Sequence, residues 1–260
     1  MNILYAIGDS NVWGAELKNI EDDRLTKLLA DKMNLIEFNT ATTGISNDRI
    51  YRVCIRDTIR FLNGEKVWCE SLGNITVKDI FVLVGWTSPT RFEYIDHKTG
   101  IYNQKRNWDG DRWGFPDEKK KLEESELVLN FTDIRYSYVK IFNQLITLHH
   151  FLKSNNIRHL FYNSFWNWDI ELNKKILETI DKSLEERQTD IENLEYDYPE
   201  NYYSLIQLWD KVPKMYKDLN QFKFLKSLGN DYFYERGHPT EDGHKEWANV
   251  VYKYIEDNKI

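Results

Sequence analysis

A serine at the end of a buried strand is the first feature of the sequence that could perform chemistry. Residues 3–7 form a short, continuous apolar run, typical of a strand buried on both faces of a parallel sheet, and the run stops at Gly8-Asp9-Ser10. A tight turn there would hold the Ser10 hydroxyl rigidly and leave the Ser10 N–H free to donate, which suits a nucleophile. The same three residues also occur as simple strand-ending turns. We interpret Asp9 as a residue that fixes the turn by accepting hydrogen bonds from backbone N–H groups.

A serine hydroxyl needs a base, and the other end of the chain offers one. The segment Glu235-x-x-His238-Pro239 places an acid and an imidazole three residues apart. Serine is a weak nucleophile unless a base lies within hydrogen-bond reach and is itself oriented by a carboxylate or carbonyl group. A single turn could direct both Glu235 and His238 toward Ser10. His244 lies six residues beyond His238, which is not the i, i+4 spacing of helical metal ligands, so no metal site is predicted.

Alternating strand and helix patterns predict the elements that position these groups. Strands are expected over 3–7, 35–38, 80–84 and 157–161, with helices over 22–33, 48–62, 133–155 and 239–254. The alternation favours an α/β protein with a parallel sheet and helices on both faces. Catalytic groups in such folds gather at the carboxyl ends of the strands. Three such ends carry turn residues: Gly8-Asp9-Ser10, Gly44 and Gly85-Trp86-Thr87.

The periodicity fails between Phe92 and Asn130, in a stretch rich in aromatic residues. We interpret 92–130 as an insertion within a single domain of residues 1–260, and we expect it to cap the active site. Trp86, Trp108 and Trp113 are the candidate substrate-binding residues, because sugars stack on aromatic faces. Burial of the same side chains in the core would explain them equally well.

Taken together and in this order, four short sequence blocks resemble those of the SGNH hydrolase superfamily, also called GDSL-like lipases and esterases. The first block is Gly8-Asp9-Ser10, the second is Gly44-Ile45-Ser46-Asn47, the third is Gly85-Trp86-Thr87-Ser88, and the C-terminal block is residues 235–240. The blocks are short but span nearly the whole chain. The resemblance implies that Ser10 is the nucleophile, that the N–H groups of Ser10 and Gly44 form the oxyanion hole, and that His238 is the base with Glu235 as its acid. It also implies a flavodoxin-like, three-layer α/β/α sandwich with a parallel sheet. No cofactor is required.

Two residues depart from the family pattern. The usual acid is Asp, whereas this chain has Glu235, whose extra methylene can be absorbed. The third block is normally Gly-x-Asn-Asp, with the asparagine as a third oxyanion donor, but this chain has Thr87 there and offers only a shorter hydroxyl. Loss of one such donor costs about 10²–10³ in turnover, so we expect an attenuated enzyme or one that has lost catalysis. Asn47, an amide on the second-block loop, is the alternative third donor.

The predicted function is hydrolysis of an ester through an acyl-enzyme on Ser10, with an O-acyl group such as acetate on a carbohydrate as the favoured substrate. The alternative is a non-catalytic protein that keeps the fold, either structural or carbohydrate-binding, such as a bacteriophage particle component. The missing asparagine at position 87 and the Asn-, Lys- and Ile-rich composition, which suits a phage or an AT-rich bacterium, favour this alternative.

Composition excludes several other classes of protein. The 260 residues are 41% apolar and 30% charged, with 9 Trp, 16 Tyr and 13 Phe, which is typical of a globular chain with a large core. A net charge of −7 with interspersed signs argues against a nucleic-acid partner. No stretch approaches the ~20 apolar residues that a membrane span requires, and no signal peptide is apparent. We therefore expect a cytoplasmic protein as synthesised, or a virion component in the alternative; the oligomeric state is not predicted.

Overall fold

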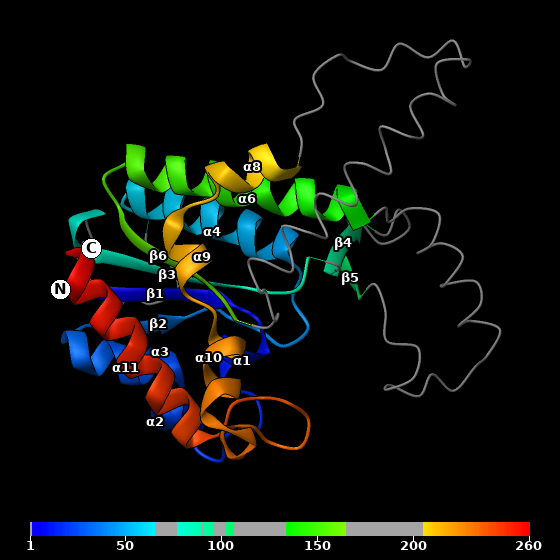
Figure 1. Ribbon diagram of the computed structural model, residues 1–260. Coiled ribbons are helices and arrows are strands. Elements are labelled where there is room, and N and C mark those ends of the chain that lie inside the picture. The colour runs from blue at the N-terminus through cyan, green and yellow to red at the C-terminus, as the bar shows by residue number, and fades with distance from the viewer. Residues whose placement is uncertain (1, 66–76, 90, 96–101, 107–133, 165–204) are drawn as a thin grey trace, which may run out of the picture.

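A parallel sheet forms the centre of the protein. The computed structural model describes residues 2–65, 77–89, 91–95, 102–106, 134–164 and 205–260 (Figure 1). Within these residues the main sheet has four parallel strands in the order β2-β1-β3-β6. The strands are β1 (Ile3–Gly8), β2 (Ile36–Asn39), β3 (Ile80–Trp86) and β6 (Arg158–Asn163).

Helices cover both faces of this sheet. Strands β1 and β3 are buried along their whole length, so their alternate side chains enter two separate cores. Tyr5 and Val82 contribute to the core under α4 (Asn47–Leu62) and α6 (Ile134–Ser154). Leu4 and Phe81 contribute to the core under α3 (Leu25–Met33) and α11 (Glu241–Asn258). The two layers of helices lie on opposite sides of the sheet in Figure 1, which confirms the predicted three-layer α/β/α sandwich.

The order of the strands brings the ends of β1 and β3 together. The chain leaves β1 to form β2 on one side, and then crosses to form β3 on the other side. Where the connections of two neighbouring strands run to opposite sides, a crevice forms at the carboxyl ends of those strands, and α/β proteins bind ligands there. Because β1 and β3 pair as far as Gly8 and Gly85, and β3 continues by only one more residue, the two strands end at nearly the same level of the sheet.

Shorter elements complete the described residues. They are α1 (Ser10–Trp13), α2 (Ile20–Asp23), η2 (Val77–Asp79), β4 (Arg91–Ile95), β5 (Tyr102–Arg106), α8 (Leu205–Lys211), α9 (Lys214–Asp218), α10 (Gln221–Leu228) and η3 (Asn230–Tyr232). The antiparallel pair β4–β5 accounts for the start of the region interpreted as an insertion, and sequence periodicity did not reveal it. Positions 107–130 lie outside the described residues, so the cap stays a prediction. In the part of the chain that the structure describes, no helix is both long and apolar enough to cross a membrane.

Candidate active site

The turn after β1 presents Ser10 at the start of a short helix. Asp9 is the N-cap of α1, and its Oδ1 accepts a hydrogen bond from the N–H of Asn11 at 3.0 Å. The expected role of Asp9 in fixing the turn is thereby confirmed. Ser10 is the first residue of α1 and is 5% exposed. The first N–H groups of a helix have no acceptor within the helix, so the Ser10 N–H remains available to a ligand.

Two glycines allow this helix to sit directly on the ends of two strands. A Cβ atom added at Gly8 would lie 2.2 Å from Cγ2 of Val12, and one added at Gly85 would lie 2.3 Å from the same atom. Real Cβ atoms do not approach other carbons so closely, because the repulsion is too steep. The glycines of the first and third blocks therefore let Val12 pack against the sheet and bring Ser10 close to the end of β3.

The imidazole of His238 reaches Ser10 from the far end of the chain. Its Nε2 lies 3.0 Å from Oγ of Ser10. His238 stands in a turn between η3 and α11, in which the Tyr234 N–H donates to the His238 carbonyl at 2.8 Å. Gly237 closes the turn with a left-handed backbone, φ 87°. The structure thus brings together the two residues that the sequence proposes as nucleophile and base.

The carboxylate beside the imidazole is not the one that the sequence indicated. Oε2 of Glu16 lies 2.7 Å from Nδ1 of His238. Glu235 is exposed and makes no hydrogen bond within the described residues, so its assignment as the orienting acid is wrong. The reason is the turn itself, which directs His238 back toward the sheet and leaves Glu235 facing solvent. Glu16 has a left-handed backbone, φ 72°, unusual for a residue with a side chain and frequent at functional sites.

The two partners of His238 define its protonation pattern. A carboxylate only accepts hydrogen bonds, so Nδ1 of His238 carries the proton toward Glu16. In a neutral ring Nε2 is then the acceptor for the Ser10 hydroxyl. The Glu16 side chain is 25% exposed, and Nε of Arg236 lies 3.8 Å from its other oxygen. This arrangement can take a proton from Ser10 and stabilise the positive charge that the ring then carries.

One asparagine joins the second and third blocks, and the loop of the second block starts at the end of β1, where the Thr42 N–H donates to the Gly8 carbonyl at 3.1 Å. Gly44 has a left-handed backbone, φ 73°. Asn47, the first residue of α4, donates from Nδ2 to the carbonyls of Thr87 (3.0 Å) and Ser88 (3.1 Å), and its Oδ1 accepts from the Thr87 N–H (3.0 Å). Because both amide hydrogens are used, Asn47 is not free to serve as the alternative third oxyanion donor. The Thr87 hydroxyl, by contrast, is fully buried and has no hydrogen-bond partner.

The candidate substrate-binding tryptophans have different outcomes. Trp86 is fully buried, and its ring packs edge-on against Phe161 in the core below α4 and α6. The prediction that Trp86 binds substrate is therefore wrong, because residue 86 still belongs to β3 and its side chain points to the core face. Trp108 and Trp113 lie outside the described residues.

Sequence reasoning missed a buried network that supports the nucleophile turn. The Ser164 hydroxyl lies 3.0 Å from Oδ1 of Asp9, and Asn11 donates from Nδ2 to the Ser164 carbonyl at 2.6 Å. Arg91 provides a buried positive charge 3.7 Å from Oδ2 of Asp9. The only signal in the sequence was that Ser164, like Ser10, is a polar residue just after a buried strand.

His244, the histidine that follows His238 in the sequence, lies in the core and not in the candidate site. His244 is fully buried in α11, and its Nδ1 accepts a hydrogen bond from the Leu25 N–H at 3.1 Å. Burial lowers the pKa of His244 to about 3. His244 is therefore neutral at physiological pH, and it links the C-terminal helix to the start of α3.

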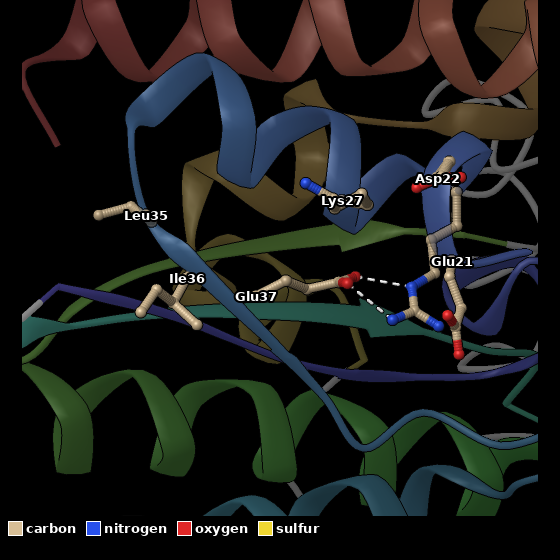
Figure 2. Close-up of a pocket in the computed structure, with 7 residues that line it drawn as sticks. Glu21, Asp22, Lys27, Leu35, Ile36 and Glu37 are labelled. Carbon is tan, nitrogen blue, oxygen red and sulfur yellow. Dashed lines mark hydrogen bonds and ion pairs between the residues drawn. The ribbon is translucent and has the colours of Figure 1, made fainter. Parts of the chain in front are cut away.

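A hollow at the sheet edge contains no catalytic group. Figure 2 shows it along β2, with Leu35 and Ile36 at one end and Glu21 and Asp22 at the other. Its main cation and anion are already paired, because Arg24 donates from Nε and Nη2 to the two oxygens of Glu37 at 2.7 and 2.6 Å. We assign no function to it.

Comparison with known proteins gives matches among solved structures. No protein-family model matches the sequence, and no curated protein matches it. A psychrotrophic esterase from Pseudoalteromonas sp. matches with 12% identity and a TM-score of 0.46, over 99% of this chain and 98% of that chain. A G-D-S-L family protein from Desulfitobacterium hafniense has 11% identity and a TM-score of 0.43, over 97% and 99%. An acetyl xylan esterase from Butyrivibrio proteoclasticus has 13% identity and a TM-score of 0.42, over 99% of this chain and 64% of that chain.

Proposed function

We propose that this protein is a serine hydrolase that cleaves a carboxylic ester, with Ser10 as nucleophile, His238 as general base and Glu16 as the acid that orients the imidazole. The observation that carries the proposal is the position of His238, whose two ring nitrogens lie 3.0 Å from the Ser10 hydroxyl and 2.7 Å from the Glu16 carboxylate. A nucleophile, a base and an orienting acid within hydrogen-bond distance are the requirements of acyl transfer by a serine.

The reaction follows from these contacts in two halves. Oγ of Ser10 attacks the acyl carbon while its proton moves to Nε2 of His238. The tetrahedral intermediate then breaks its bond to the alcohol oxygen, which takes the proton from Nε2, and the acyl group remains on Ser10. A water molecule repeats the attack with His238 as its base, and releases the acid and free Ser10. Glu16 stays ionised and stabilises the imidazolium that forms in each half.

Three donors are proposed for the oxyanion of the intermediate. The N–H groups of Ser10 and Gly44 belong to the turns after β1 and β2, and neither donates to a protein acceptor within the described residues. The buried and unpartnered Thr87 hydroxyl is the third. Donors that point to the place where charge develops lower the barrier most when water is excluded, and the burial of Thr87 favours that condition.

The substrate that we propose is an O-acylated carbohydrate, and acetate is the simplest acyl group. The support is the aromatic content of residues 92–130, since sugars stack on aromatic rings. The sugar oxygen would take the proton from His238 and leave as a free hydroxyl. No step of this reaction requires a cofactor.

Labelling with a fluorophosphonate probe tests the proposal, because such probes react only with an activated serine. We expect the probe to label wild type and not Ser10→Ala or His238→Ala. Glu16→Gln should lower kcat for a p-nitrophenyl ester by about 10²–10⁴-fold, since it removes the charge that balances the imidazolium. Glu235→Gln is the matched control, an identical change on an exposed neighbour of the base, and should leave kcat unchanged.

Three results would refute this assignment. A loss only in Glu235→Gln would return the acid role to Glu235, and equal losses in Glu16→Gln and Glu235→Gln would refute a specific role for Glu16. Absence of labelling in wild type under conditions that label a known serine esterase would favour the non-catalytic alternative, in which the fold serves binding or structure.

A further inference from the structure

We infer that Asn47 is a positioning residue, which holds the second and third blocks at the spacing that the oxyanion hole needs. This inference rests on the proposed function and concerns how the same site is kept in shape. Asn47 would not touch the substrate, because its amide hydrogens are already donated to the Thr87 and Ser88 carbonyls.

The backbone of Thr87 needs such a partner because it continues past the end of a pair of strands. Strands β1 and β3 pair as far as Gly8 and Gly85, after which the chain of β1 turns into α1. On the other side β3 pairs with β6 as far as Trp86 and Asn163. Thr87 is therefore the first residue after β3 that has no strand beside it.

Asn47 takes the place of the missing strand. Its Oδ1 accepts from the N–H of Thr87, and its Nδ2 donates to the carbonyl of the same residue, both at 3.0 Å. A side-chain amide thus forms the pair of hydrogen bonds that the C=O and N–H groups of a neighbouring strand would form. Asn47 is 1% exposed, so water could not replace these bonds if the side chain were removed.

The other end of this connection is also rigid. Asn47 begins α4, whose N-cap is Ser46, and Gly44 stands three residues earlier in the same loop. The next residue, Asp48, accepts hydrogen bonds from Lys140 and Gln144 of α6, both at 2.9 Å. The amide of Asn47 therefore joins the loop that carries the Gly44 N–H to the loop that carries the Thr87 hydroxyl.

The pattern of these bonds also explains why the Thr87 hydroxyl is left free. Asn47 binds the N–H and the carbonyl of Thr87 but not its Oγ1 atom, which is buried and has no partner. A hydroxyl is shorter than the amide of the usual third block, so its donor position depends more strongly on where the backbone lies. Fixing that backbone through Asn47 is the way in which this chain could use a threonine as a donor.

The test is Asn47→Asp. This change keeps the size of the side chain and the acceptor for the Thr87 N–H, but it replaces both donors with a carboxylate oxygen that faces the carbonyls of Thr87 and Ser88. We expect kcat for a p-nitrophenyl ester to fall about 10–100-fold with KM nearly unchanged, because donors that are misplaced for the oxyanion affect the transition state more than the bound ester. Fluorophosphonate labelling of Ser10 should slow to a similar extent.

The matched control is Tyr5→Phe, which removes a buried hydrogen bond of 3.0 Å from Tyr5 to Asp57, between β1 and α4 and outside the site. It should lower stability without changing kcat. If Asn47→Asp does not fold, Asn47→Ser, which keeps one short donor, replaces it with the same expectation.

The outcomes separate this inference from the proposed function. A wild-type kcat in Asn47→Asp, or an equal loss of kcat in Tyr5→Phe, would overturn the role of Asn47 and leave the hydrolase intact. A rise in KM with unchanged kcat would also overturn it, because it would indicate contact with the bound ester. Ester hydrolysis that persists in Ser10→Ala would instead overturn the proposed function, and this inference with it.

Discussion

Replacement of Thr87 by valine should make the protein more stable and less active at the same time. Valine has the shape of threonine, with a methyl group in place of the hydroxyl. In the resting structure that hydroxyl is fully buried and has no partner. Its removal therefore breaks no hydrogen bond, whereas during catalysis it is one of the three proposed oxyanion donors.

The magnitudes follow from these two states. A buried hydroxyl without a partner destabilises a fold by about 1–3 kcal/mol, so Thr87→Val should raise the free energy of unfolding by about 1 kcal/mol. For a domain of this size that corresponds to a melting temperature about 2–4 °C higher. Removal of a reaching amide donor costs about 10²–10³ in turnover. A short hydroxyl should contribute less, and we expect a loss of about tenfold, or 1.4 kcal/mol of barrier.

Urea denaturation and steady-state kinetics on the same preparation measure both effects. A stability gain with unchanged kcat would refute the donor role and make the unpaired hydroxyl a packing defect. A loss of both stability and kcat would also contradict the reasoning, because it would mean that the hydroxyl has a partner in the resting state.

Three further predictions follow from the same geometry. Thr87→Asn should raise kcat about tenfold, since a longer amide would restore the usual third donor and Asn47 cannot compete for the position; kinetics on simple acetyl esters checks this. Gly85→Ala should lower kcat about tenfold or more by pushing on Val12, whose Cγ2 would lie 2.3 Å from the new Cβ, and Val12→Ala in the same chain should restore part of the activity. For His244 the folded pKa of about 3 lies below the usual 6.5, so its contribution to stability is complete above pH 6.5 and declines as the pH falls toward 3. At pH 5 the decline amounts to about 2 kcal/mol. His244→Asn, which keeps an acceptor for the Leu25 N–H, should show a smaller loss between pH 7 and pH 5 in urea denaturation.

The fold was predictable because each buried element has a regular pattern. The continuous apolar runs of β1 and β3 predicted strands covered on both faces, and the helical spacing in α3, α4, α6 and α11 predicted what covers them. Both strands are longer than their apolar runs: β1 ends at Gly8, and β3 passes Gly85 to end at Trp86. The sequence did not predict these ends, because the two glycines are needed for the close packing of Val12 and not for hydrophobic burial. The β4–β5 pair was missed because β4 alternates polar and apolar residues only over positions 91–94, and β5 has one aromatic residue followed by four polar ones.

The nucleophile and the base were predictable for a different reason. Ser10 and His238 each stand beside residues with strong local preferences, a strand-ending glycine in one case and a proline before a helix in the other. Such neighbours restrict the backbone, so the direction of the side chain can be inferred from short range alone. Trp86 and Asn47 lack this advantage, because the direction of Trp86 depends on the register of β3 and that of Asn47 on how α4 packs beside the end of β3.

The orienting acid shows where this kind of inference ends. Separation along the chain favoured Glu235, three residues from the base, over Glu16, which is 222 residues away. Yet residues three apart within a tight turn point in different directions, whereas Ser10 begins α1, Glu16 follows that short helix, and both side chains contact the His238 ring. The left-handed backbone at Glu16 has no signature in the sequence, since a glutamate seldom adopts it and no glycine or asparagine marks the position. If the strained backbone is retained because it places the carboxylate against His238, then Glu16→Gly should relieve the strain and abolish most of the activity, while stability is unchanged or improved. A kcat close to that of wild type would refute this reasoning, and a loss of stability would show that contacts of the Glu16 side chain stabilise the fold by more than the strained backbone costs.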